Sequence, residues 1–391
     1  MKVKKGLWFQ KGVYFFLSRC FGWFFMRLND YHGEKTKIKS DTFLLLANHN
    51  NDMDWAFPVI LTGRHMRFVA SSNIMNGFAG KLVKFLAGPI PRAKGASADD
   101  TAELIMENLK AGISVAIFPE GNKSWDGKTG FISERNARIV KESGCALVTY
   151  RTEGGYLRTP RWSDIVRKGP MFGRVVREYT KEELARMSVP EIAEVIRKDL
   201  AVNAFDFQRE HMERYPGKDL TKNLDCVLYI CPECHGVSTI KASADSFSCS
   251  CGLKGRMNEY GFLESLTEKP LTFDNTASWN DWQKSWLKEN KDTLKENKKC
   301  LASDGPAEFI SIKNGERTVI ASGVTAELYA DCLKIGEHGF PLDKISRFST
   351  FRNRRLFFTC EEGYFELHFS KPVSGLKYDA VHRVMTDKAY E

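Results

Sequence analysis

The stretch Leu44-Leu45-Leu46-Ala47-Asn48-His49-Asn50-Asn51-Asp52-Met53-Asp54-Trp55 decides how the chain is organised. An apolar run with strand character stops in a polar turn, and residues 55–61 then resume an apolar pattern typical of a helix. A strand that ends in a polar corner presents side chains at the edge of a sheet, where a substrate can reach them.

This turn holds a histidine and an aspartate five positions apart. A histidine can act as a general base, and a nearby carboxylate can fix its tautomer and stabilise the imidazolium. We therefore expect His49 in the turn and Asp54 in the first helical turn to form such a pair. The alternative is a helix N-cap made by Asn51 or Asp52, beside a surface histidine.

A second polar turn follows a second apolar segment with strand character, residues 114–118. This turn, residues 119–124, presents a carboxylate at Glu120, a backbone N–H at Gly121 and a cation at Lys123. Between the two stretches, a rigid turn that contains two prolines leads to a further cation at Arg92. Cations together with backbone N–H groups suit an anionic ligand that also carries hydroxyl groups.

Three motifs in this order resemble the 1-acylglycerol-3-phosphate acyltransferase family of glycerolipid acyltransferases. They are His-x4-Asp at residues 49–54, Gly-x-Ile-Pro-Arg at 88–92 and Phe-Pro-Glu-Gly at 118–121. The resemblance covers about residues 30–200, and the combination is specific where each motif alone is not. It implies an α/β fold with a mixed sheet flanked by helices.

The resemblance also implies residue roles. The family's general base corresponds to His49, and the partner of that base corresponds to Asp54. Residues that bind the glycerol phosphate would be Arg92, Glu120, Gly121 and Lys123. Where the family usually has Thr and Arg after Glu-Gly, this chain has Asn122 and Lys123. Lysine lacks the bidentate fork of arginine, so it should bind phosphate with a less defined geometry.

With 391 residues the chain is long enough for two or three domains, and its composition, 42% hydrophobic and 27% charged, is that of a globular protein. Residues 1–40 contain nine Lys or Arg and two acidic residues, so much of the net charge of +9 lies at this end. Basic residues interleaved with aromatics favour an anionic membrane surface over nucleic acid. Four of the ten cysteines cluster in a metal-like pattern, which favours a reducing, cytosolic setting.

Residues 7–28 are rich in aromatic side chains. Lys11 and Arg19 interrupt the apolar run before the ~20 residues that span a bilayer, and no signal-peptide cleavage site follows. We expect a helix or helix pair, residues 1–29, that lies in the interface at the cytoplasmic face of the membrane as a peripheral or monotopic anchor. The alternative is a helix that packs on the neighbouring domain.

Residues 30–215 alternate between strand and helix patterns, which predicts an α/β acyltransferase domain. Strands are expected at 42–47, 66–70, 114–118 and 145–151. Helices are expected at 55–62, 77–86, 99–110, 134–143 and 181–200, with Pro190 in the first turn of a new segment within the last range.

Paired cysteines mark residues 225–265 as a zinc-ribbon-like module. Cys231 and Cys234 form one pair, and Cys249 and Cys251 form the other, with Cys-x-Cys in place of the usual Cys-x-x-Cys. Four thiolates complete the tetrahedral coordination of Zn²⁺ and leave no open position, so the metal should be structural. An iron centre or reduced free cysteines are the alternatives.

The remaining chain predicts two further parts. Residues 266–300 should form a helical linker, in which Trp279, Trp282 and Trp286 share one helix face. Residues 301–391 contain short segments with the alternating pattern of strands. Separate strands are expected at 317–321 and 326–329, among others, and a final helix is expected at 377–385. This order resembles a mostly-β, pleckstrin-homology-like domain.

The leading functional hypothesis is transfer of a fatty acyl group from acyl-CoA or acyl carrier protein to 1-acylglycerol-3-phosphate, which gives phosphatidic acid in phospholipid biosynthesis. It needs no catalytic cofactor. The alternatives are a different lysolipid acceptor, or a membrane-associated scaffold with a vestigial acyltransferase domain. A nucleic-acid binder is disfavoured because the basic charge is concentrated at an aromatic terminus.

Overall fold

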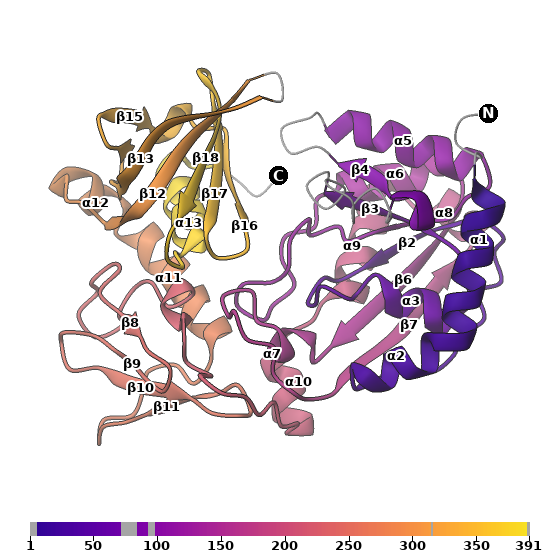
Figure 1. Ribbon diagram of the computed structural model, residues 1–391, viewed down its shortest axis with the longest axis horizontal. Coiled ribbons are helices and arrows are strands. Elements are labelled where there is room, and N and C mark those ends of the chain that lie inside the picture. Colours follow the sequence, from indigo (N-terminus) through magenta and orange to yellow (C-terminus); the bar gives the residue numbers. More distant parts are fainter. Residues whose placement is uncertain (1–5, 72–83, 93–97, 314–315, 389–391) are drawn as a thin grey trace. The chain divides into compact units, whose positions relative to one another are not determined.

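The computed structural model describes residues 6–71, 84–92, 98–313 and 316–388. The chain forms two compact units, both drawn in Figure 1. Unit 1 comprises residues 1–124, 128–158 and 168–213, and unit 2 comprises residues 125–127, 159–167 and 214–391. Two short segments, 125–127 and 159–167, therefore leave unit 1 and belong to unit 2.

Unit 1 is built on a seven-stranded mixed sheet with the strand order β1-β7-β6-β2-β5-β3-β4. Neighbouring strands are parallel except for β6 and β7, which are antiparallel. The predicted α/β fold with a mixed sheet is confirmed. The strands are β1 (Tyr31–His32), β2 (Phe43–Ala47), β3 (Arg67–Ser71), β4 (Ile90–Arg92), β5 (Val115–Ile117), β6 (Ala146–Glu153) and β7 (Met171–Tyr179).

Helices cover both faces of this sheet (Figure 1). All five residues of β2 are buried. Leu44 and Leu46 share a core with α5, α6 and α9, whereas Phe43 and Leu45 share one with α1 and α3. A strand that is covered on both faces has a continuous apolar sequence, which explains the apolar run at residues 44–47. The helices are α1 (Leu7–Phe16), α2 (Gly22–Leu28), α3 (Ala56–Thr62), α5 (Ala98–Lys110), α6 (Arg135–Ser143), α7 (Gly155–Arg158), α8 (Lys181–Arg186), α9 (Val189–Leu200) and α10 (Ala204–His211).

The helical region predicted over 181–200 is divided into α8 and α9, and Pro190 lies in the first turn of α9 as expected. Both begin with a capping box, in which the N-cap side chain and the third helical residue bond each other's backbone N–H. The second box, Ser188 with Glu191, starts a new helix, so the first must end before it. The helix predicted over 77–86 lies largely outside the described residues.

The aromatic segment near the N-terminus forms α1, a π-helical turn at Leu17–Phe21 and α2. Tyr14 packs in the core of unit 1, so part of this segment rests on the domain. The opposite side chains are exposed: Trp8 is 89% and Trp23 71% accessible, and Phe9, Phe15, Phe16, Phe21, Phe24 and Leu28 are exposed as well. No helix within the described residues is both long and apolar enough to span a bilayer.

Unit 2 contains a four-stranded sheet, two consecutive helices and a seven-stranded antiparallel sheet followed by one helix. The predicted mostly-β C-terminal part is confirmed, and the division of unit 2 into separate modules stays a prediction. The elements are β8 (Lys241–Ala242), β9 (Phe247–Ser248), β10 (Lys254–Met257), β11 (Leu263–Ser265), α11 (Thr276–Glu289), α12 (Lys291–Asn297), β12 (Ala302–Lys313), β13 (Glu316–Leu328), β14 (Cys332–Ile335), β15 (His338–Pro341), β16 (Arg347–Phe351), β17 (Arg355–Cys360), β18 (Gly363–Phe369) and α13 (Gly375–Thr386).

One expectation for unit 2 is wrong: the two strands predicted at 317–321 and 326–329 are a single strand, β13. Gly323 lies in the gap that was expected between these two strands, and it has a φ of +72°. In the sheet it forms a bulge, because two residues of β13 stand opposite one residue of β12 between the pairs Ala307–Val324 and Phe309–Ala321. The ladder therefore continues through the glycine.

Candidate active site

Hydrogen bonds to β6 fix the turn that follows β2. Asn48 Nδ2 donates to the carbonyl of Thr152 over 2.8 Å, and the Thr152 N–H donates to Asn48 Oδ1 over 2.7 Å. Asn50 Nδ2 donates to the same carbonyl over 3.0 Å. Both asparagines are buried, so these bonds determine where the turn leaves the sheet and where His49, between them, is held.

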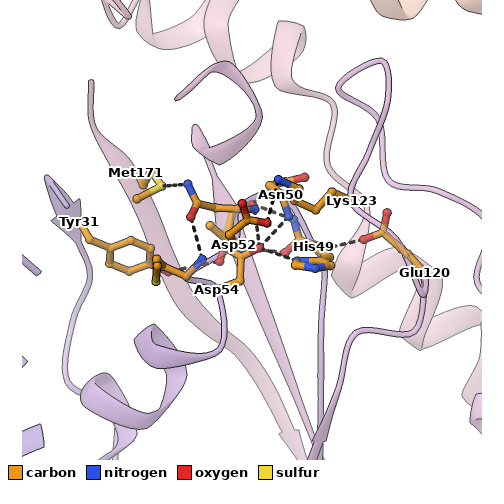
Figure 2. A network of polar contacts seen from close by, with 12 residues as sticks. Tyr31, His49, Asn50, Asp52, Asp54, Glu120, Lys123 and Met171 are labelled. Atoms are coloured by element: carbon orange, nitrogen blue, oxygen red, sulfur yellow. Dashed lines mark hydrogen bonds and ion pairs between the residues drawn. The ribbon is translucent and has the colours of Figure 1, made fainter. Parts of the chain in front are cut away.

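His49 and Asp54 lie together as predicted (Figure 2). His49 Nδ1 and Asp54 Oδ2 are 3.0 Å apart; the side chain of Asp54 is 1% exposed and that of His49 23%. Because a carboxylate only accepts, Nδ1 carries the hydrogen and Nε2 presents its lone pair. Nε2 has no hydrogen-bond partner among the described residues. This is the arrangement of a general base that is open to a substrate.

The carboxylate of Asp54 is held by its own turn. Besides the imidazole, Asp54 Oδ2 accepts the backbone N–H groups of Asn50 and Asn51, each over 2.7 Å. Three donors on one oxygen leave the carboxylate little freedom, so it also fixes the orientation of His49.

Helix α3 starts later than we expected. It begins at Ala56, and its N-cap residue Trp55 makes no side-chain capping bond. Asp54 therefore lies in the turn before the helix. Asn51 Oδ1 accepts the Met53 N–H, so the alternative of an N-cap by Asn51 or Asp52 is not observed.

The segment that follows β5 also contacts His49. The ring of Phe118 stacks on the imidazole, with centroids 4.4 Å apart and an interplanar angle of 21°. Glu120 Oε1 accepts the His49 N–H over 2.7 Å, and Oε2 accepts the Gly130 N–H over 2.6 Å. Figure 2 shows Glu120 bonded to the backbone at His49. Glu120 thus positions this segment, and its contact with a substrate stays a prediction.

Gly121 and Arg92 are neighbours in space. A Cβ at Gly121 would lie 3.3 Å from Nη1 of Arg92, so glycine leaves room for the guanidinium. Gly121 has a φ of +70°, and its N–H donates to the Phe118 carbonyl over 3.0 Å. That N–H is therefore engaged within the turn, contrary to the expectation that it faces a ligand. Exposed Arg92, at the end of β4, supplies the cation.

Lys123 connects the two turns. Its Nζ lies 2.9 Å from Oδ1 of Asp52, and the two side chains are 18% and 67% exposed (Figure 2). The backbone is connected as well, because the Ser124 N–H donates to the His49 carbonyl over 3.3 Å. The predicted residues of unit 1 thus gather at the carboxyl ends of β2, β4 and β5, the edge where parallel sheets bind ligands. Phosphate binding by Lys123 stays a prediction.

Several residues of the site were missed in the sequence. The Asn-x-Asn pair at the end of β2 was a usable signal, because short amides often bond backbone groups. The buried hydroxyls of Tyr31 and Tyr150, 2.7 Å apart, gave no signal, since they come from segments 119 positions apart. Burial raises the pKa of both tyrosines, so both remain neutral.

The four predicted cysteine ligands meet in unit 2, with all four Sγ atoms within 4.8 Å of one another. Cys231 and Cys251 have Sγ atoms 3.6 Å apart, as do Cys234 and Cys249. A tetrahedral ZnS₄ centre with Zn–S bonds of about 2.3 Å requires S···S separations of about 3.8 Å. The four thiols therefore fit Zn²⁺, which would link the two cysteine pairs and leave no coordination position for a substrate.

Comparison with known proteins gives matches in unit 1. A family model described as Acyltransferase matches residues 29–152. A curated relative, the chloroplastic 1-acyl-sn-glycerol-3-phosphate acyltransferase LPAT1 of Arabidopsis thaliana, is 29% identical over 114 residues, which cover 28% of this chain and 31% of that protein. The chain thus spans about a third of the length of this relative.

A solved structure is also similar. The 1-acyl-sn-glycerophosphate acyltransferase PlsC of Thermotoga maritima aligns with a TM-score of 0.43 and 19% identity, over 56% of this chain and 85% of that one.

Proposed function

We propose that this protein transfers a fatty acyl group to the free hydroxyl of a lysophospholipid, and the match of an acyltransferase family model to residues 29–152 supports the proposal. The acceptor that suits the site best is 1-acylglycerol-3-phosphate, and the donor is acyl-CoA or acyl carrier protein. The observation that carries the proposal is the His49–Asp54 pair, 3.0 Å apart beside the turn that bears Glu120.

The reaction follows from this pair. Nε2 of His49 takes the proton of the glycerol hydroxyl, and the resulting alkoxide attacks the thioester carbonyl. Asp54 stabilises the imidazolium through Nδ1. As the tetrahedral intermediate collapses, the C–S bond breaks and the thiolate leaves, taking the proton from the imidazolium. The new ester bond forms directly between donor and acceptor, so no acyl-enzyme is expected.

Arg92 is the residue we assign to the acceptor phosphate. Arg92 is an exposed residue whose Nη1 lies next to Gly121, and a guanidinium can bind two phosphate oxygens at once. The Arg92→Ala variant should therefore raise the KM for the acceptor more than the KM for the donor, with a smaller effect on kcat.

The acceptor and product are membrane lipids, and the N-terminal helices carry the surface for that contact. Trp8 and Trp23 are more than two-thirds exposed, and the α1–α2 segment carries Lys11, Arg19 and Arg27 among these aromatics. Aromatic side chains with basic neighbours favour the interface of an anionic membrane. We propose peripheral or monotopic attachment at the cytoplasmic face.

The experiment that tests this function offers purified protein acyl-CoA, or acyl carrier protein, with a panel of lysolipids in vesicles. Mass spectrometry identifies which acceptor gains an acyl chain. The proposal predicts transfer to phosphate-bearing lysolipids, with 1-acylglycerol-3-phosphate preferred. Absence of transfer from both donors to every acceptor would refute it and would favour the scaffold alternative.

A further inference from the structure

Residues 125–127 lie directly after the turn that bears Glu120 and Lys123, yet they belong to unit 2. The chain enters unit 2 after Ser124 and returns to unit 1 at Lys128. Two peptide units separate the Cα atoms of Ser124 and Asp126, a span of at most about 7 Å. Whatever holds Asp126 therefore limits where the turn can lie.

Helix α11 holds Asp126 with two hydrogen bonds. Asn280 Nδ2 donates to Asp126 Oδ2 over 2.6 Å, and Thr276 Oγ1 donates to the Asp126 carbonyl over 2.8 Å. Asp126 is 7% exposed, Asn280 1% and Thr276 0%. A buried carboxylate that accepts from a fixed amide is strongly held, because releasing it would break a hydrogen bond to a charged group away from water.

The second segment that leaves unit 1 supports this anchor. Arg161, within 159–167, places its guanidinium 4.5 Å from the centre of the Trp125 ring. Its Nη2 donates to both Oγ1 and the carbonyl of Thr350 in β16. Trp125 is thus covered by a buried cation that the large sheet of unit 2 fixes in place.

Helix α11 is itself bonded to the chain before the first cysteine pair. Trp279 Nε1 donates to the Ile230 carbonyl over 3.0 Å. Gln283 Oε1 accepts the N–H groups of Tyr229 and Ile230 over 2.7 and 2.8 Å. Ile230 precedes the ligand Cys231 directly, and Trp279 and Gln283 are fully buried. The helix is therefore a rigid support.

We propose that Asp126 is a positioning residue for acyl transfer, through which α11 sets the turn that carries Glu120 and Lys123. The inference rests on the proposed function for its kinetic consequence. On the unit 1 side the turn already bonds His49, through Glu120 and Ser124. Because Asp126 is bonded to α11 and lies two residues after Ser124, this end of the turn is restricted as well, so fewer conformations compete with the one in which Glu120 bonds the His49 N–H.

The test reverses the polarity of the Asp126–Asn280 bond. The Asn280→Asp variant sets two carboxylates at hydrogen-bond distance, which should drive the segment away. Adding Asp126→Asn restores one donor and one acceptor. Tyr378→Phe is the matched control, since it removes another buried bond to a carboxylate of unit 2, from Tyr378 Oη to Asp304 Oδ2 over 2.8 Å.

Two readouts are combined on the full chain: steady-state kinetics and backbone hydrogen exchange of residues 118–128. We expect Asn280→Asp to raise the acceptor KM about tenfold and to speed exchange in this segment, with kcat and the donor KM changed less. The double variant should return both readouts to near wild type. Tyr378→Phe should leave both unchanged.

The outcomes separate the inference from the proposed function. Faster exchange that the double variant rescues supports the inference even if the wild-type protein transfers no acyl group, which would refute only the proposed function. If Asn280→Asp leaves exchange and acceptor KM unchanged, Asp126 does not position the turn. The inference is equally overturned if Tyr378→Phe produces the same changes as Asn280→Asp.

Discussion

Replacing Asp54 by asparagine tests how much the buried carboxylate contributes to catalysis. Asp54 Oδ2 accepts three hydrogen bonds, from the His49 ring and from the backbone at Asn50 and Asn51. An asparagine that places its oxygen there keeps the two backbone donors but removes the charge that stabilises the imidazolium. If the amide turns the other way, Nδ2 faces Nδ1 and selects the wrong tautomer. Both orientations should slow proton transfer.

The magnitude follows from the role of a general base. Proton transfer by a positioned base contributes about 10²–10⁴-fold, so kcat should fall about 10³-fold, or about 4 kcal/mol at ~1.36 kcal/mol per tenfold. The KM values of donor and acceptor should change little, because Asp54 is 1% exposed and cannot touch either. The loss of stability should stay near 1–2 kcal/mol, the range for one altered buried hydrogen-bond network.

The assay measures initial rates of acyl transfer and chemical unfolding on the same preparations. Asp199→Asn is the matched control: Asp199 is a buried carboxylate of unit 1 that accepts from Thr149 Oγ1 and Tyr179 Oη over 2.7 and 2.8 Å. It should lose similar stability and keep its kcat. An Asp54→Asn protein that is folded and retains more than about a tenth of wild-type kcat would contradict the reasoning.

Four further predictions concern other parts of the molecule. Gly121→Ala should raise the acceptor KM about tenfold, because the new Cβ would lie 3.3 Å from Nη1 of Arg92. Gly144→Ala is the control: Gly144 has a similar φ of +61° and no atom within 4 Å of the new Cβ, so this variant should lose only stability, by about 1 kcal/mol. Replacing both Trp8 and Trp23 by serine should weaken binding to anionic vesicles at least about tenfold in sedimentation and leave the rate with a water-soluble acceptor analogue unchanged. Elemental analysis should find one zinc per chain, and Cys234→Ser should lose it together with the thermal stability of unit 2; a full zinc content in that variant would exclude the four-cysteine site. Burial, with Arg67 and Lys11 nearby, lowers the pKa of His65 to about 4, so His65 stays neutral in the folded protein at a pH where the unfolded chain already binds a proton, below about pH 6.5. The free energy of unfolding should therefore fall by about 2 kcal/mol between pH 6.5 and 4 in the wild type and by less in His65→Gln. Identical pH profiles of the two proteins would contradict this.

The sequence predicted the parts of the fold that local patterns encode. The sequence predicted the buried strand β2 from its apolar run and the polar turn that follows it. It also predicted the His49–Asp54 pair. The start of α3 was misplaced by one residue, because no capping side chain marks it. The break expected between residues 321 and 326 is absent, since only the pairing with the partner strand shows whether a glycine with positive φ ends a strand or forms a bulge within it.

Contacts between residues that are far apart in the sequence could not be predicted from the sequence. Nothing in the polar sequence around Asp126 signals that it is bonded to Asn280, 154 positions away. The proximity of Arg92 to Gly121 was implied only by the family resemblance, and the stack of Phe118 on His49 by nothing at all. Such contacts depend on which strands become neighbours in the sheet, and that is decided by the whole domain.

The most direct measurement of the central claim is the initial rate at which purified His49→Ala protein forms phosphatidic acid from acyl-CoA and 1-acylglycerol-3-phosphate, compared with wild type. In the proposed reaction the imidazole accepts the hydroxyl proton, so the rate should fall at least about 10³-fold while the protein stays folded and binds vesicles normally. A folded His49→Ala protein with the wild-type rate would show that the proton goes elsewhere.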